Sequence, residues 1–184
     1  MHEIFVVKTD DFEEHSYEKL LEILPDTEKS KILPKRNGIN SLIGALLVRY
    51  AVKKTFGIPM KKIEILREKS DKPYLKDYDN IHISISHSQN VVVCAVSDKP
   101  VGVDIEKIRP VSSGVMKRTC SENELNEILK NSDPVSSFIN TWTKKEAILK
   151  RKGTGITDKE IKKCLENEKL FSTMYDNFWI SCTL

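Results

Sequence analysis

The sequence lacks any run of about 18 apolar residues, so no segment is expected to span a membrane. It also lacks paired cysteines. The four thiols form no CxxC motif and no Cys/His cluster, which argues against a zinc site and indicates free thiols: Cys94, Cys120, Cys164 and Cys182. The N-terminal residues Met-His-Glu-Ile show no signal-peptide pattern. We therefore expect a cytoplasmic protein with no membrane partner.

A strong excess of charge of one sign is also missing. The net charge is only +3 over 184 residues, whereas dedicated nucleic-acid binders are usually far more basic. Apolar residues make up 39% of the chain and charged residues 31%, which is typical of a globular protein with a heavily charged surface. The length is sufficient for a sizeable core, in one domain or in two small halves.

The most informative stretch reads Val-Gly-Val-Asp-Ile-Glu over residues 101–106. Its apolar residues alternate with Gly102, Asp104 and Glu106, which is the period of a half-buried strand. The two carboxylates then lie on one face, about 6.5–7 Å apart. Two like charges this close favour a positive partner, and hard oxygen ligands suit Mg2+ better than zinc or copper. Alternatively, Asp104 caps a turn and Glu106 begins a solvated loop.

A third carboxylate lies on the long helix predicted over residues 134–151, which begins at an Asp-Pro start signal. Glu146 falls inside the apolar stripe of this helix, where an ionised carboxylate is unfavourable without a counter-charge or a metal. An ion pair with Lys150, one turn later, is one explanation. The other is that these two groups join the two strand carboxylates in a metal-assisted phosphoryl transfer, in which the lysine offsets charge on the leaving phosphate.

A second long helix is predicted over residues 39–56 from apolar residues at i, i+3, i+4 and i+7, with Gly57 as its C-terminal cap. Arg49 lies close to the apolar stripe, and we expect it to be a structural residue paired with a carboxylate or with backbone carbonyls. A shorter helix over residues 26–33 precedes it. The cations of this region form either a solvated basic face or a phosphate-binding edge: Lys29, Lys31, Lys35 and Arg36.

The middle of the chain predicts three successive strands, over residues 81–86, 91–96 and 101–106. A turn at residues 87–90 separates the first two. Because the strands are adjacent in sequence, we expect one sheet to carry both His87 and the two strand carboxylates. Further on, Ser121 and Glu124 fit a capping box for a helix that ends near residue 129.

The two halves of the chain share an outline. Each contains one long helix, and Val91-Val92-Val93-Cys94 echoes Trp179-Ile180-Ser181-Cys182 near the C-terminus. This echo suggests two α+β halves packed together with a cleft between them.

These motifs resemble those of the 4'-phosphopantetheinyl transferases, in the order and spacing of the monomeric, surfactin-activating (Sfp) type. The resemblance covers nearly the whole chain and includes the Lys72-Pro73 turn and the helix segment Leu42-Ile43-Gly44. The stretches that carry it are Gly102 to Glu106, Trp142 to Lys150, Gly153-Thr154-Gly155 and Ile85-Ser86-His87-Ser88. It implies a pseudo-two-fold α+β fold of two α/β halves, each a small antiparallel sheet packed on a long helix, with the active site in the cleft between them. Residues 1–100 would form the coenzyme A side, and residues 101–184 would carry the metal site and the catalytic helix.

The resemblance also implies an activity. Members of the family move the phosphopantetheine arm of coenzyme A onto a serine hydroxyl of an acyl-, peptidyl- or aryl-carrier protein and release adenosine 3',5'-bisphosphate. By the match, Asp104, Glu106 and Glu146 would bind Mg2+ or Mn2+, which holds the pyrophosphate. Glu146 would also deprotonate the carrier serine, directly or through a water, and Lys150 would contact the phosphates and stabilise the leaving group.

Two further residues match positions at which the family binds coenzyme A. Lys72, at the Lys-Pro turn, matches a coenzyme-binding lysine, and His87, after Ser86, matches the residue that binds the 3'-phosphate. Asn40 departs from the family, which often has a basic residue there; Lys31, Lys35 or Arg36 would supply that charge. Without the resemblance, His87 is more typical of a turn histidine with no ligand. Two other functions remain open: a coenzyme A or nucleotide-binding module without catalysis, and a Mg2+-dependent phosphohydrolase that uses water.

Overall fold

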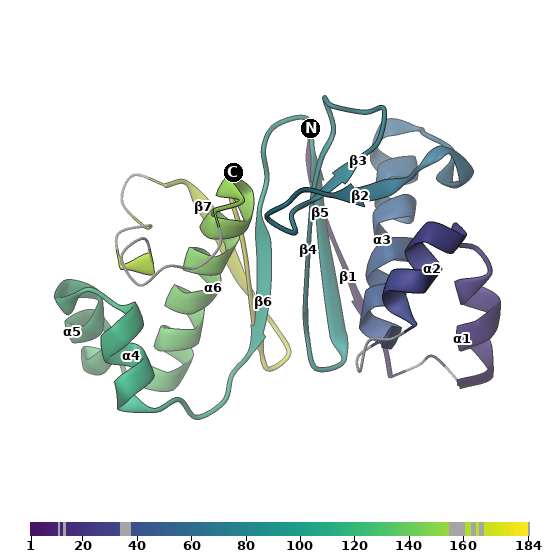
Figure 1. The fold of residues 1–184 in the computed structure, drawn as a ribbon. Coiled ribbons are helices and arrows are strands. Elements are labelled where there is room, and N and C mark those ends of the chain that lie inside the picture. The colour runs from purple at the N-terminus through teal and green to yellow at the C-terminus, as the bar shows by residue number, and fades with distance from the viewer. Residues whose placement is uncertain are drawn as a thin grey trace. The chain divides into compact units, whose positions relative to one another are not determined.

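The computed structural model describes residues 1–10, 12, 14–33, 38–154, 161–162, 165 and 168–183. The chain divides into two compact units, Met1–Pro100 and Val101–Leu184. Each unit packs a three-stranded antiparallel sheet on one 19-residue helix, which confirms the predicted α+β class (Figure 1). Within the described ranges, no helix combines the length and the apolar character that crossing a membrane requires.

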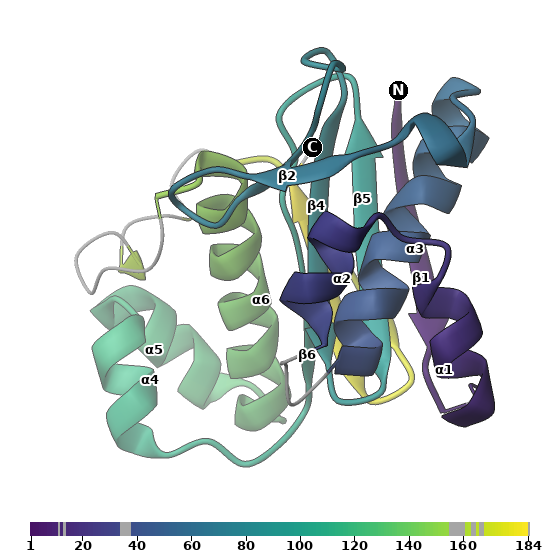
Figure 2. The same cartoon turned by 45° about the vertical axis from the view of Figure 1, so that its right-hand side comes forward.

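In the first unit the sheet has the strand order β1-β5-β4, with β1 at His2–Lys8, β5 at Val91–Ser97 and β4 at His82–Ser88. Every residue of β5 is buried, as its continuous apolar run predicts for a central strand. Helix α3 (Gly38–Phe56) lies along one face of this sheet (Figure 2). The core between them is formed by Val48, Ala51, Val52, Ile83, Cys94 and Val96.

Smaller elements pack around α3 in the same unit. Helices α1 (Glu14–Leu21) and α2 (Asp26–Ile32) share an apolar cluster with it, formed by Leu24, Ile32, Leu42 and Ala45. A 3-10 turn (Met60–Lys62) leads into the hairpin of β2 (Ile65–Arg67) and β3 (Pro73–Leu75). The predicted Lys-Pro turn is therefore the point at which the chain enters β3.

In the second unit the strand order is β6-β8-β7, with β6 at Val103–Lys107, β8 at Phe178–Thr183 and β7 at Leu170–Tyr175. Helix α6 (Pro134–Lys152) packs on this sheet and begins with Asp133 as its N-cap, as predicted. Helices α4 (Ser113–Thr119) and α5 (Glu122–Lys130) precede it, and α5 begins with the predicted capping box. Their core is formed by Met116, Cys120, Ile128, Phe138 and Ile139.

The second unit repeats the topology of the first. Both sheets place the last strand in the centre, and both long helices end at a left-handed glycine, Gly57 (φ 73°) and Gly153 (φ 69°). The two units are therefore related by duplication. However, the sequence match of residues 91–94 with residues 179–182, which aligns Cys94 with Cys182, is one residue out of register. Cys94 packs on the α3 side of its sheet, whereas Ser181, not Cys182, hydrogen-bonds to Thr143 of α6. A one-residue shift moves a strand side chain to the opposite face.

The prediction that one sheet carries His87 and the strand carboxylates is wrong. His87 lies within β4 of the first sheet, and Asp104 lies on β6 of the second. The adjacent strands separate because β5 pairs with the N-terminal β1 and β6 pairs with the C-terminal β8. The turn after β4 is also tighter than predicted, with Gln89 at φ 50°.

Candidate functional site

The motif glycine allows β6 to lie directly against α6. A Cβ atom added to Gly102 would lie 1.9 Å from the carbonyl oxygen of Ala147 and 2.6 Å from the backbone nitrogen of Arg151. These contacts are to helix backbone, which does not move aside as a flexible side chain would. The absence of a side chain at position 102 therefore brings the strand close to the helix turn that carries Glu146 and Lys150.

Asp104, two residues further along β6, is buried with 3% of its surface exposed. Its Oδ1 atom is 2.6 Å from Nζ of Lys150 on α6. A buried carboxylate is costly without a counter-charge, and this ammonium group supplies one. The positive partner that the sequence predicts for the strand carboxylates is therefore, for Asp104, a lysine of the long helix.

Glu146 lies half-buried on α6, one turn before Lys150. Burial raises the pKa of its carboxyl group to about 7, and repulsion from Asp104 and Glu106 adds to the rise, whereas Lys150 opposes it. These electrostatic effects mean that the three acids and the lysine named from the sequence share one environment. A carboxyl group with a pKa near neutrality exchanges its proton readily at physiological pH.

The donor set is chemically suited to a hard divalent cation, because Mg2+ prefers carboxylate oxygens. Three carboxylates that repel one another would be stabilised by such a charge. In the arrangement seen, however, Lys150 contacts Asp104, and among the described residues no three acidic, histidine or cysteine side chains are grouped closely enough to hold a metal ion. Ligation by all three acids would therefore require their side chains to turn.

The described coenzyme-binding candidates of the first unit lie on α2, on β4 and just before β3. Lys31 is exposed on α2, Lys72 is half-buried immediately before β3, and Ser86 and His87 are neighbours on β4. Because successive strand residues point to opposite faces, Ser86 (buried) and His87 (exposed) do not face the same side of the sheet. Lys35 and Arg36 lie outside the described residues.

Asn40 has a role that the sequence does not reveal. This buried residue of α3 donates from Nδ2 to the carbonyl oxygen of Gln89 at 2.7 Å, and its Oδ1 accepts a hydrogen bond from Thr9 at 3.4 Å. The amide therefore fastens the turn that follows His87 to the start of α3. No local pattern signals this contact, because the two residues are 49 positions apart.

Comparison with known proteins places this sequence in a family. A sequence model described as 4'-phosphopantetheinyl transferase, N-terminal, matches residues 11–99, and a second, described as 4'-phosphopantetheinyl transferase superfamily, matches residues 100–176. Together the two models span most of the chain, and the second covers β6 and α6. The chain therefore belongs to the 4'-phosphopantetheinyl transferase superfamily.

Several curated relatives carry that name. A 4'-phosphopantetheinyl transferase of Bacillus subtilis is 34% identical over 125 residues, which cover 67% of this chain and 56% of the relative. The gsp transferase of Aneurinibacillus migulanus is 39% identical over 66% of this chain and 51% of its own length. The L-aminoadipate-semialdehyde dehydrogenase-phosphopantetheinyl transferase of Saccharomyces cerevisiae is 26% identical over 83% of this chain and 62% of its own. The chain thus spans little more than half the length of the bacterial relatives that it matches.

Proposed function

We propose that this protein transfers the 4'-phosphopantetheine arm of coenzyme A to a serine hydroxyl of an apo-carrier protein and releases adenosine 3',5'-bisphosphate. Family membership supports the reaction class, and the matched bacterial relatives are named for the same transfer. Two observations carry the proposal: Lys150 contacts the buried Asp104 at 2.6 Å, and burial together with repulsion from Asp104 and Glu106 raises the pKa of Glu146, one helix turn before Lys150, to about 7.

In the proposed reaction, the serine oxygen attacks the phosphorus atom that bears the pantetheine arm. The bond from that phosphorus to the oxygen bridging the two phosphates breaks, and adenosine 3',5'-bisphosphate leaves. Glu146 takes the serine proton, directly or through a water. Lys150 offsets the charge that develops on the leaving phosphate.

Asp104, Glu106 and Glu146 are the residues that would hold Mg2+. When bound there, this cation supplies Lewis-acid neutralisation of the pyrophosphate. Lys150 would then move from Asp104 to the phosphate oxygens, so its 2.6 Å contact with Asp104 gives way to a contact with substrate. The ammonium group thus neutralises Asp104 before the substrate is bound.

The first unit would bind the coenzyme itself. Lys31 and Lys72 offer cations for phosphate oxygens, and β4 offers two further contacts, His87 on one face and Ser86 on the other. We also propose that the protein acts as a monomer in the cytoplasm. Sedimentation of the purified chain tests the monomer.

The direct test mixes the purified protein with coenzyme A, Mg2+ and a panel of apo-carrier proteins. Intact-protein mass spectrometry should show that a carrier gains one phosphopantetheine arm. Omission of Mg2+ in the presence of EDTA should abolish the gain, and a carrier with its acceptor serine replaced by alanine should not react.

The alternative functions give different results in the same assay. Binding of coenzyme A with no transfer to any carrier would indicate a binding module. Release of adenosine 3',5'-bisphosphate without a carrier would indicate a phosphohydrolase. Either result, across a panel that spans fatty-acid, polyketide and peptide carriers, would overturn the transferase proposal.

A further inference from the structure

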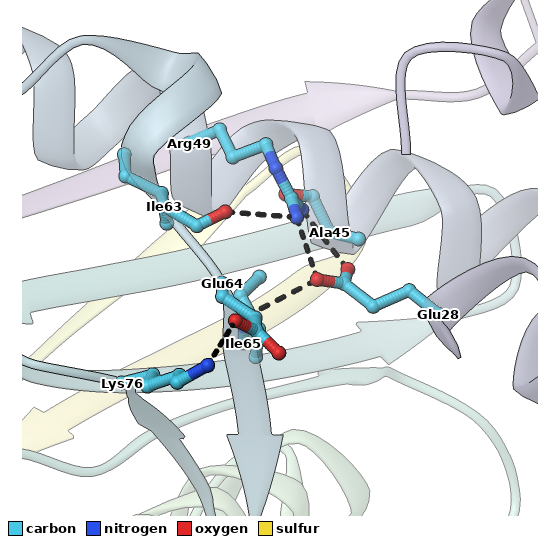
Figure 3. A network of polar contacts seen from close by, with 7 residues as sticks. All are labelled: Glu28, Ala45, Arg49, Ile63, Glu64, Ile65 and Lys76. Atoms are coloured by element: carbon cyan, nitrogen blue, oxygen red, sulfur yellow. Dashed lines mark hydrogen bonds and ion pairs between the residues drawn. The ribbon is translucent and has the colours of Figure 1, made fainter. Parts of the chain in front are cut away.

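A buried ion pair in the first unit joins Glu28 of α2 to Arg49 of α3 (Figure 3). The two side chains form parallel hydrogen bonds, from Nη2 to Oε1 at 2.6 Å and from Nη1 to Oε2 at 3.0 Å. Arg49 also donates to the carbonyl oxygens of Ala45 and Ile63, each at 3.1 Å. Its side chain is 2% exposed and that of Glu28 is 9% exposed. The predicted structural role of Arg49 is thus confirmed, with both kinds of partner.

The same pair also fixes the start of the β2–β3 hairpin. Oε1 of Glu28 accepts a second hydrogen bond from the backbone nitrogen of Ile65 at 3.2 Å, and Arg49 holds the carbonyl oxygen of Ile63. These two backbone groups flank the entry into β2 (Figure 3). A guanidinium group is planar, with its donors in a fixed fork, so it sets orientation as well as distance. One ion pair therefore fixes α2, α3 and β2 relative to one another.

The elements joined in this way carry the candidate coenzyme-binding lysines of the first unit. Lys31 is exposed on α2, one turn after Glu28. Lys72 immediately precedes β3, which pairs with β2, and its carbonyl oxygen accepts a hydrogen bond from the backbone nitrogen of Glu68 at 3.0 Å. The contacts of Glu28 and Arg49 therefore hold together the segments of backbone that carry Lys31 and Lys72.

The packing of α2 on α3 does not by itself require the ion pair of Glu28 and Arg49. Leu24, Ile32, Leu42 and Ala45 already form an apolar cluster around α2 and α3, and a buried ion pair is often no more stabilising than apolar residues of similar volume. The polar contacts instead add a specific geometry. We propose, on the basis of the proposed function, that Glu28 and Arg49 are positioning residues for coenzyme A: they hold Lys31 and Lys72 in the arrangement that binds its phosphate groups.

The second unit contains a simpler version of the pair. Lys145 of α6 is 1% exposed and donates to Oε2 of Glu124 at 2.6 Å and to the carbonyl oxygen of Thr119 at 2.8 Å. These partners belong to α5 and to the end of α4, and neither is part of a hairpin. Arg49, with its planar fork of donors, occurs in the unit where the same pair also contacts the β2–β3 hairpin.

The test measures coenzyme binding and turnover separately in two variants. Arg49→Lys keeps the charge but loses the fork, and Glu28→Gln keeps the shape but loses the charge. Calorimetry without carrier should show a rise of about tenfold in the Kd for coenzyme A and for adenosine 3',5'-bisphosphate, with a similar rise in KM. The kcat value should stay within about twofold, and the KM for the carrier should not change.

Two control variants separate positioning from general damage. Glu64→Gln breaks the exposed ion pair to Lys76 (2.9 Å) in the same hairpin, and Val52→Ala opens the core behind α3 without touching the pair (Figure 3 shows Glu64 and Lys76). Both should bind coenzyme A like the wild type. The inference is overturned if both pair variants retain wild-type affinity, or if Val52→Ala weakens binding as much at equal loss of stability. A wild-type protein that neither binds coenzyme A nor transfers its arm would overturn the proposed function instead.

Discussion

The two units share one scaffold but carry different side chains on it, and the long helices show where they diverge. Counted back from the left-handed glycines Gly57 and Gly153, Tyr50 and Glu146 each lie seven residues before the glycine. At the same helix position, the first unit thus has an aromatic ring and the second has the carboxylate of raised pKa. The backbone is repeated while the chemistry is not, as expected when function resides in side chains placed on a common fold.

The facing strands show the same contrast. Glu3 of β1 accepts a hydrogen bond from Thr55, two residues before the first glycine, and Gly102 lies against Arg151, two residues before the second. Two positions further along these strands stand Phe5 and Asp104. Phe5 meets Tyr50 edge-to-face, with ring centroids 5.8 Å apart, so the first unit closes this position with two rings. The second unit has two acids at this position, Asp104 and Glu146. Two neighbouring carboxylates repel each other, so they need a positive partner.

One feature is common to both units. Arg49 and Lys145 each lie eight residues before the glycine, and each is buried against a glutamate in the first turn of a preceding short helix. The common pair indicates that the short helices are attached to the long helix in the same way in both units. Holding this helix is a property of the repeated fold, whereas holding the β2–β3 hairpin is specific to the first unit.

The largest expected effect comes from removing an acid from the second unit. Glu146→Gln or Asp104→Asn should lower kcat/KM for carrier modification by about a thousandfold, because charge stabilisation and proton transfer are both lost. Tyr50→Phe, at the matching position of the first unit, should leave turnover unchanged. Steady-state kinetics checks the contrast, and near-normal turnover of Glu146→Gln would show that the site is misplaced.

A change in stability is expected at the strand-helix contact. Gly102→Ala forces a Cβ against the backbone of Ala147 at 1.9 Å, so β6 must move away from α6. We expect the free energy of unfolding to fall by about 3 kcal/mol. Glu3→Ala, the matching change in the first unit, removes only one hydrogen bond and should cost about 1 kcal/mol. Urea denaturation measures both, and equal losses would contradict the proposed correspondence.

The buried pair of the second unit can be tested by a double-variant cycle. Lys145→Met leaves Glu124 without its counter-charge and should lower the free energy of unfolding by about 3 kcal/mol. Adding Glu124→Leu removes the unpaired carboxylate and should restore part of the lost free energy of unfolding. The recovery is incomplete because Glu124 also forms the capping box of α5. If the double variant is no more stable than Lys145→Met, the unpaired carboxylate is not the cause.

A smaller effect is expected from pH, through Glu146 of the second unit. Because the folded pKa of Glu146 is about 7 and its ordinary value is 4.5, the folded state binds more protons than the unfolded state between these values. This carboxyl group therefore makes the metal-free protein less stable as pH rises from about 4.5 to about 7, by up to about 2 kcal/mol. Urea unfolding in EDTA across this range should show the loss in the wild type but not in Glu146→Gln. Added Mg2+ should reduce it, and parallel curves for the two proteins would contradict the shift.

Local signals in the sequence were reliable where they were strong. The Asp-Pro start of α6, the capping box of α5 and the glycine ends of the long helices are set by neighbours within one or two turns. The sequence indicates helix after residue 110 but no bounds for α4, because its seven residues contain few apolar positions. It does not predict β7, because Leu170–Tyr175 does not alternate. The formation of α4 and β7 therefore depends on packing against the rest of the second unit.

The sequence by itself singled out the residues that we propose carry the chemistry, because the acids and Lys150 stand in motifs whose types and spacing are visible in the chain. Only the tertiary structure decided the partners. Arg49 meets Glu28 across 21 residues and Lys150 meets Asp104 across 46, while His87 and Asp104 lie on different sheets. The physical reason is that helix periods and caps depend on near neighbours, whereas ion pairs and strand pairing depend on which distant segments are buried together.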